Sequence, residues 1–229
     1  MTTCLLCGQE FTGHTTILQI FSVKKKKPPV ICLHCRQRFT PLSGNRCQVC
    51  SREWADGDVC NDCRAWGKFY GKNLLYNHSL YHYNDAFHDL MVNYKRYGDY
   101  VLYAVLQELC GQEVAKIVAD LYVPVPTSPE HRQKRQFDTV SAIYQELVPL
   151  TFLLDKKPGG GAQGEKNKRE RMRSKQSFII RKNDLAADFS GKILLLDDIY
   201  TTGRTLYHAR DKLLTVFPQA KISSFSICR

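Results

Sequence analysis

The cysteines near the start of the chain constrain its fold more than any other feature. Eight of the ten cysteines form four Cys-x-x-Cys pairs within the first 63 residues. Each pair brings two thiolates to one point, and two pairs complete a closed tetrahedral Zn²⁺ site. The pairs therefore predict two structural zinc ions, whose ligands are Cys4, Cys7, Cys32, Cys35, Cys47, Cys50, Cys60 and Cys63.

Two other uses of these cysteines fit less well. Disulfides form in an oxidising compartment, whereas the first residues have neither the basic region nor the apolar region of a signal peptide. A thioredoxin-like redox motif has one Cys-x-x-Cys at the start of a helix, not four in a row. Sequential pairing of the Cys-x-x-Cys units is the simplest arrangement, and an interleaved cross-brace remains open.

The chain is expected to be cytoplasmic and to lie outside the membrane. No apolar run approaches the roughly 18 residues that a membrane-spanning helix needs. The two remaining cysteines, Cys110 and Cys228, stand beside Leu109 and Ile227 and are predicted to be buried as small apolar residues.

Composition changes after Cys63, and this change predicts two units. Residues 1–72 are poor in aliphatic periodicity, so metal must replace much of their core, as in a double zinc ribbon. In residues 73–229, short apolar strands alternate with helical patterns. This alternation predicts an α/β fold with a mainly parallel sheet flanked by helices. Strands are expected at 121–126, 152–154, 178–180, 193–196 and 224–227.

The most informative segment is residues 193–205, an apolar strand that ends in two acids and a small-residue turn. Ligands of parallel α/β sheets bind at the carboxyl ends of the strands. Backbone N–H groups and the following helix N-terminus favour a phosphate, and glycine permits a positive φ in the turn. The acids can accept hydrogen bonds from ribose hydroxyls. The segment predicts a site for a 5-phosphorylated ribose, formed by Asp197, Asp198, Thr201, Thr202, Gly203, Arg204 and Thr205.

Two alternatives compete for this segment. An apolar strand that ends in acids also occurs in P-loop nucleotidases, but the chain has no G-x-x-x-x-G-K-[ST] sequence. An ordinary strand–turn–helix unit, with Asp and Thr as helix caps, is the other alternative.

Residues 194–205 resemble the phosphoribosyl pyrophosphate (PRPP) motif of type I phosphoribosyltransferases, with Tyr200 where an aliphatic residue is usual. Together with the cysteine pairs, the whole chain resembles the ComF family, most closely the ComFC competence proteins of Gram-positive bacteria. Lys95, Gly98 and Asp99 match the Lys-aromatic-x-Gly-Asp element of that family, and 123–126 match its first strand.

This resemblance implies a role in natural transformation, in which incoming single-stranded DNA is handled beside a ComFA-type helicase. It also implies binding of PRPP, with which Mg²⁺ would arrive. An active phosphoribosyltransferase that modifies a nucleobase or an amine is the alternative. The Arg-Gly-Phe-Asn-Gln element of the family is half kept, because Gln136 replaces its glycine between Arg135 and Phe137. A side chain there hinders close approach of the backbone to pyrophosphate, which favours binding over catalysis.

The net charge of +11 makes a polyanionic partner worth considering. In the expected pyrophosphate loop, residues 127–138, the basic side chains of Arg132, Lys134 and Arg135 can neutralise a diphosphate. Residues 156–175 contain eight basic and two acidic residues, and their glycines suggest a loop that closes over phosphate or grips a nucleic-acid backbone. A solvated basic surface is the alternative in both places. The predicted nucleic-acid or phosphate contacts are Lys95, Arg96, Lys166, Lys168, Arg169, Arg171 and Arg173.

Overall fold

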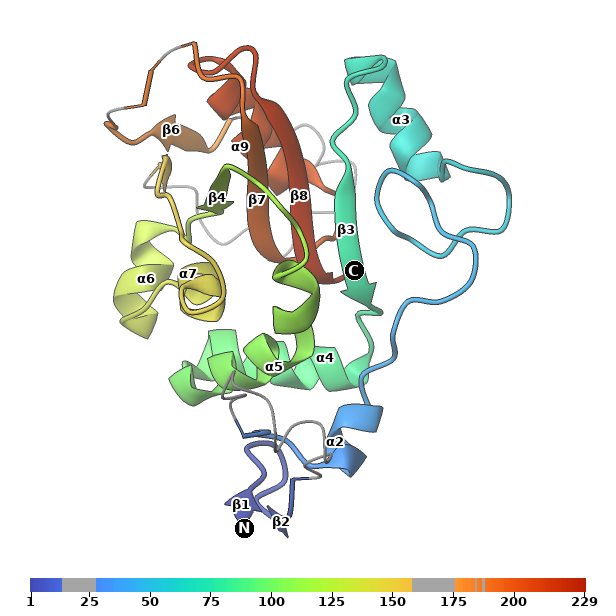
Figure 1. Ribbon diagram of the computed structural model, residues 1–229, viewed down its shortest axis with the longest axis vertical. Helices are drawn as coiled ribbons and strands as arrows, with labels where there is room; N and C mark the ends of the chain where they lie inside the picture. Colours follow the sequence, from blue (N-terminus) through green and yellow to red (C-terminus); the bar gives the residue numbers. More distant parts are fainter. Residues whose placement is uncertain (14–27, 158–175, 184, 187) are drawn as a thin grey trace.

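The computed structural model describes residues 1–13, 28–157, 176–183, 185–186 and 188–229. Within these residues the main sheet has four strands, all parallel, in the order β3–β8–β7–β4 (Figure 1). Helices flank this sheet, which confirms the predicted α/β fold. The strands are β3 (Asn77–Tyr81), β4 (Leu121–Pro124), β7 (Lys192–Ile199) and β8 (Lys221–Cys228).

Strand β7 is buried on both faces because helices cover each side of the sheet. Leu194 and Leu196 belong to the core shared with α4 (Asp85–Met91), α5 (Tyr103–Val114) and α7 (Thr139–Tyr144). Ile193 and Leu195 belong to the core shared with α3 (Asn61–Tyr70) and α9 (Arg204–Leu214). Successive side chains of a strand point to opposite faces, so one continuous apolar run supplies both cores.

The alternation of serine with apolar residues near the C-terminus correctly predicts strand β8, but the serines are buried too. The Asn77 amide donates hydrogen bonds to Ser79 Oγ at 2.7 Å and to Ser226 Oγ at 3.2 Å, and the two serine hydroxyls lie 2.8 Å apart. The hydroxyl of Ser51, the residue after the third Cys-x-x-Cys pair, donates to the carbonyl of Asn77 at 2.8 Å. This face of the sheet is therefore polar and hydrogen-bonded rather than solvated.

Helical segments lie on either side of Gly98. Helix α4 continues into a π-helical turn, η1 (Val92–Tyr97), and Gly98 ends this turn with a φ of +75°. A short 3₁₀ turn, η2 (Tyr100–Leu102), then leads into α5. π-Helical turns are rare and often mark functional sites; this one carries Lys95 and Arg96.

Two short antiparallel ribbons lie outside the main sheet. The strand expected at 152–154 instead covers Leu154–Lys156 (β5) and pairs with β6 (Phe178–Ile180). The other ribbon pairs β1 (Thr2–Thr3) with β2 (Glu10–Phe11) beside α2 (Leu33–Gln37), and Figure 1 shows all three below α4 and α5. In the described part of the chain, no helix is long and apolar enough to cross a membrane.

Candidate metal centres and phosphate-binding site

The eight paired cysteines gather into two groups in chain order. Among the described residues, the four Sγ atoms of each group lie within 4.8 Å of one another. The pairing is therefore sequential rather than a cross-brace. In both groups the second Cys-x-x-Cys pair begins a helix, because Cys32 and Cys60 are the N-caps of α2 and α3. The first group is Cys4, Cys7, Cys32 and Cys35, and the second is Cys47, Cys50, Cys60 and Cys63. We call the segment that carries the first group the first cysteine module, and the segment that carries the second group the second cysteine module.

Both groups fit a structural zinc ion. Zinc binds thiolates at about 2.3 Å, so tetrahedral ligands lie about 3.8 Å apart. The Sγ atoms of Cys7 and Cys32 are 3.9 Å apart, and those of Cys50 and Cys60 are 3.6 Å apart. The backbone N–H of Cys60 donates to the Cys47 sulfur at 3.3 Å, which stabilises a thiolate there. Four sulfur ligands leave no open position for a substrate, so each ion would be structural.

The second cysteine group is joined to the predicted phosphate-binding turn by a tryptophan. Helix α3 begins at this group and contains Trp66, whose indole N–H donates to the carbonyl of Thr202 at 2.9 Å. The Trp66 ring also stacks on Tyr207 of α9, with 4.4 Å between ring centroids. A hydrogen bond and ring stacking thus fix the turn between β7 and α9 to the second cysteine module.

The C-terminal residue makes a second connection between this group and the turn. The Arg229 guanidinium donates to the carbonyl of Cys50 at 2.6 Å and lies 4.8 Å from the centre of the Tyr200 ring. The Tyr200 ring in turn lies against Gly203, because a Cβ at Gly203 would be only 2.3 Å from the Tyr200 hydroxyl oxygen. Tyr200, which departs from the family pattern, therefore packs against the turn and supports it.

Glycine is required at position 203 for its conformation as well as for space. Gly203 has a φ of +79° and is the N-cap of α9, so the N-cap residue has no side chain to cap the helix. The N–H of Arg204 donates to the Thr202 hydroxyl at 3.4 Å, and the N–H groups at a helix N-terminus favour an anion. The buried Tyr200 hydroxyl also has no hydrogen-bond partner within the described chain. Because this hydroxyl is buried against Gly203, the turn offers a ligand its backbone N–H groups rather than the hydroxyl.

The two acids lie buried at the carboxyl end of β7. The Lys95 ammonium, from the π-helical turn, is 2.6 Å from Asp198 Oδ2. Asp197 Oδ1 accepts a hydrogen bond from the backbone N–H of Asp198 at 2.9 Å. Burial, and secondarily the neighbouring charge of Asp198, raise the pKa of Asp197 to about 7. A carboxyl group that titrates near neutral pH can donate as well as accept a hydrogen bond, which suits sugar hydroxyls.

A basic cavity of about 340 Å³ lies beside these acids and is lined on one side by Ile199, the last residue of β7. Among its described lining residues none is acidic. We call it the basic pocket. The structure thus brings together four of the predicted phosphate or nucleic-acid contacts with two histidines, as Lys95, Arg96, Lys134, Arg135, His88 and His131.

The expected pyrophosphate loop is largely helical. Residues Pro129–Arg135 form α6, with Ser128 as its N-cap, and Arg132 is exposed on this helix outside the basic pocket. Gln136 ends the helix with a φ of +66°. This left-handed conformation is one that glycine adopts without strain, whereas glutamine adopts it at a cost of about 1 kcal/mol. The position therefore requires the backbone geometry for which glycine is the usual residue.

Several sequence-based expectations lie outside the described residues. They are the five remaining predicted contacts in the 156–175 segment. The five contacts are Lys166, Lys168, Arg169, Arg171 and Arg173.

The sequence patterns did not predict Trp66, Tyr83 or Lys156 as residues of these sites. Lys156 ends β5 and is half-buried. Burial lowers its pKa, while the nearby charges of Asp197 and Asp198 oppose that effect. Its basic surroundings in the sequence were a usable signal. No local pattern indicates that Trp66 reaches Thr202, which is 136 positions away.

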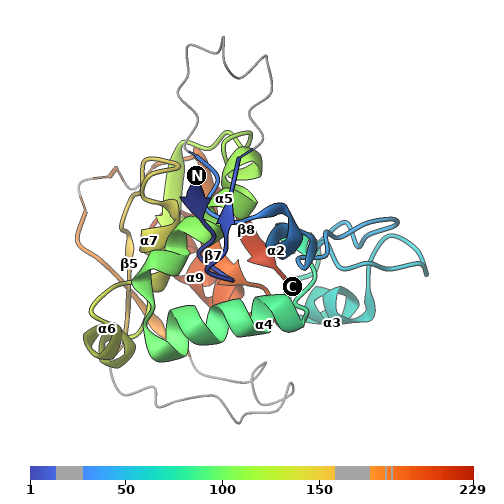
Figure 2. The same ribbon diagram turned by 90° about the horizontal axis from the view of Figure 1, so that it is seen from below.

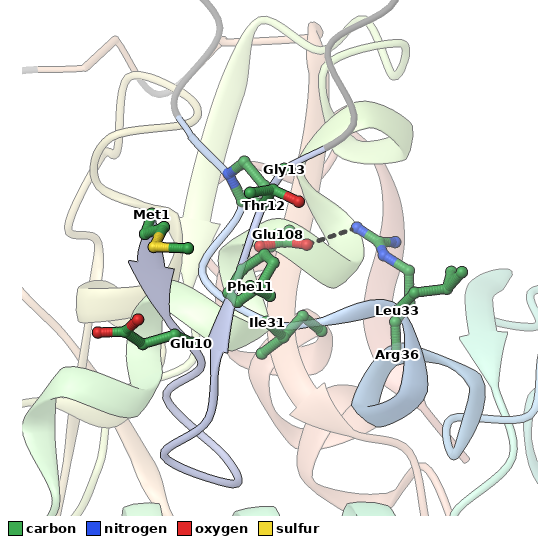
Figure 3. Close-up of a pocket in the computed structure, with 10 residues that line it drawn as sticks. Met1, Glu10, Phe11, Thr12, Gly13, Ile31, Leu33, Arg36 and Glu108 are labelled. Carbon is green, nitrogen blue, oxygen red and sulfur yellow. Dashed lines mark hydrogen bonds and ion pairs between the residues drawn. The ribbon is translucent and has the colours of Figure 1, made fainter.

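A larger cavity, about 530 Å³, lies beside the first cysteine group (Figure 3). Two acids, Glu10 and Glu108, line this cavity, and Glu108 of α5 has a partner on each oxygen. Its Oε1 is 2.8 Å from the Arg36 guanidinium, and its Oε2 accepts from the backbone N–H of Val30 at 2.6 Å. These contacts attach the first cysteine module to α5, so Glu108 and Arg36 serve the fold.

The sequence comparisons agree with this architecture. No protein-family model matches the chain. The competence protein ComFC of Bacillus subtilis (strain 168) is 30% identical over 236 residues, which cover 99% of this chain and 94% of that protein. The competence protein ComFC of Streptococcus pneumoniae (strain ATCC BAA-255 / R6) is 29% identical over 228 residues, 99% of each chain. Similarity of this extent covers the cysteine modules and the sheet together, and the chain therefore belongs to the ComFC family of competence proteins.

Proposed function

We propose that this protein binds PRPP or a related ribose phosphate and assists the handling of incoming single-stranded DNA in natural transformation. One observation carries the proposal. Two buried acids lie near the carboxyl end of β7, and a helix whose N-cap is a left-handed glycine follows them beside the basic pocket. Acids, helix N-terminus and cations in this order suit hydroxyls, one phosphate and further phosphates, respectively.

Each part of the ligand has a proposed partner. The 5-phosphate would bind the turn of Thr201, Thr202, Gly203, Arg204 and Thr205, and the ribose hydroxyls would bind Asp197 and Asp198. The diphosphate would face Lys134 and Arg135, with Arg132 at the rim. Mg²⁺ would arrive with the diphosphate and screen its charge.

Two features favour binding over transfer of the phosphoribosyl group. Helix α6 and the strained Gln136 occupy the place of an open pyrophosphate loop. Lys95 also neutralises Asp198, so a ligand must exchange with an existing ion pair before it reaches that acid. Electrostatic positioning is the main source of catalysis in such reactions, and this site is arranged for contacts to a bound ligand.

The DNA part of the proposal rests on the basic pocket and on the relatives named as competence proteins. Non-specific binding of nucleic acid comes mainly from cations that contact phosphates. We propose that a ComFA-type helicase is the partner and that the protein acts in the cytoplasm. We further propose that residues 1–72 form the structural zinc unit and 73–229 the ligand-binding unit.

Paired titrations with PRPP and single-stranded DNA, alone and together, test the proposal. In Asp198→Asn we expect PRPP affinity to fall about 10- to 100-fold, because a hydrogen bond to a charged group is lost. Asp89→Asn, an exposed acid on α4, is the control and should bind normally. DNA affinity should fall with rising salt.

Three outcomes would contradict parts of this proposal. Absence of PRPP binding to the zinc-loaded protein would remove its first half, and DNA affinity that is unmeasurable or independent of salt would remove its second. Turnover of PRPP with any nucleobase or amine, lost in Asp198→Asn, would replace it with the phosphoribosyltransferase alternative.

A further inference from the structure

A second cavity adjoins the basic pocket at the carboxyl edge of the sheet. It has a volume of about 430 Å³, and Tyr83 and Ile199 line both cavities. Its other walls come from the second cysteine module and from the start of the phosphate-binding turn. We call it the mixed pocket. It lies where parallel α/β sheets bind ligands.

The side chains of the mixed pocket differ in chemistry from those of the basic pocket. The mixed pocket contains an acid, Glu53, whose Oε1 lies 2.9 Å from His82 Nε2. Thr201 and Arg52 also line it, and the Arg52 guanidinium is held by Asp62, with 3.0 Å between Nη1 and Oδ2. Hydrogen-bond donors and acceptors therefore surround a space that also has an aromatic wall. Such a set suits a planar ring with polar edges better than it suits a phosphate.

Tyr83 supplies the aromatic wall. Its backbone N–H donates to the carbonyl of Arg229 at 2.8 Å, which fixes the residue at the edge of the sheet. The residue nevertheless remains 42% exposed, and among the described aromatic rings its ring makes an edge-on contact with His88, with 6.5 Å between the ring centroids. Exposed tyrosine rings beside cationic grooves are typical stacking platforms for the bases of single strands.

We propose that the two cavities together bind one nucleotide unit of a single strand. The phosphate lies in the basic pocket, and the base lies in the mixed pocket, stacked on Tyr83. This inference rests on the proposed handling of single-stranded DNA and names the residues that would sense the base. It also gives the second cysteine module a direct part in binding, because Arg52 and Glu53 form a wall of the base site.

The test compares two oligonucleotides of equal length, an oligothymidylate and a fully abasic strand with the same number of phosphates. Zinc-loaded full-length protein should bind the normal strand about 5- to 100-fold more tightly, since stacking of one base has an effect of this size. In Tyr83→Ala this preference should disappear, whereas in Tyr83→Phe it should persist because the ring is kept. Tyr76→Ala, which removes another exposed tyrosine (55% exposed) from outside both pockets, should leave the preference unchanged.

The outcomes separate this inference from the proposed function. Equal binding of both strands by the wild-type protein overturns the base site and leaves phosphate-based DNA binding intact. A preference that survives in correctly folded Tyr83→Ala, judged by circular dichroism and zinc content, also overturns it. If neither strand binds, the base site and the DNA half of the proposed function both fail.

Discussion

Each of the two cysteine groups has four cysteine ligands, paired in chain order, and a helix that starts at its third cysteine. The two groups nevertheless contact different parts of the molecule. The first belongs to the part of the chain that contains β1, β2 and α2, which Figure 1 shows below α4 and α5 and Figure 2 shows from below, and its Cys7 is exposed. The second is buried at all four cysteines and shares a core with β7 and α9. Identical ligand sets can therefore serve separate purposes, which the surrounding contacts decide.

The difference has a physical basis in what each module replaces. The first module has a short helix of five residues and is attached to α5 through Glu108, so metal would mainly hold the module itself together. The second module supplies Trp66, the carbonyl of Cys50 and one wall of the mixed pocket. We therefore expect loss of the second ion to disturb ligand binding, and loss of the first to disturb mainly local stability.

Matched ligand substitutions give the largest expected effect. In Cys63→Ser we expect the loss of one zinc ion, a decrease of about 3–5 kcal/mol in the free energy of unfolding and loss of PRPP binding. Cys35→Ser, an equally buried ligand of the first group, should lose one ion but keep PRPP affinity within about twofold. Elemental analysis, urea unfolding and calorimetry measure the three quantities. Equal loss of PRPP binding in both variants would remove the distinction between the groups.

The titration of Asp197 gives the next largest effect and concerns the ligand site alone. The folded pKa is raised from 3.8 to about 7, so between these values the folded protein holds a proton that the unfolded chain has released. Stability should therefore fall by about 2–4 kcal/mol as pH rises from 4 to 7. Asp197→Asn should abolish this decline, whereas Cys35→Ser should keep it. Urea unfolding at several pH values measures the slope, and identical slopes in wild type and Asp197→Asn would refute the assignment.

Chelation sharpens the comparison through rates. Because Cys7 is exposed and all ligands of the second group are buried, a chelator should remove the first ion at least about 10-fold faster. Zinc release followed with a coloured chelator should show two phases of one ion each. PRPP binding should survive the first phase and disappear in the second. A single phase, or binding lost with the first ion, would contradict the comparison.

The smallest expected effect comes from a single hydrogen bond. Trp66→Phe keeps an aromatic ring on Tyr207 but removes the donor to Thr202, so PRPP affinity should fall about 5-fold, equivalent to about 1 kcal/mol. Both zinc ions should remain bound. The control is Trp54→Phe, because the indole N–H of Trp54 is buried and has no hydrogen-bond partner within the described residues. If the two variants bind PRPP equally, Trp66 does not position the turn.

Features with a local cause could be predicted well. Strand β7 and the acids near its end follow from an apolar run and its termination. The backbone at Gln136 and the helical form of the 129–135 segment were not predicted, because the matching family element suggested a loop. The Lys95–Asp198 ion pair joins positions more than a hundred residues apart, and no periodicity announces it.

The sequence by itself determined the four cysteine pairs and the parallel α/β class, and it predicts zinc at the cysteines and a phosphate-binding turn after β7. Each depends on residue types at short spacing, where covalent geometry limits the possible arrangements. Only the tertiary structure decided that the second cysteine module supports that turn, and that Tyr83 stands between two cavities. Both arise where strand ends from distant parts of the chain meet at one edge of the sheet. Sheet order and register, which sequence spacing does not encode, set which residues meet there.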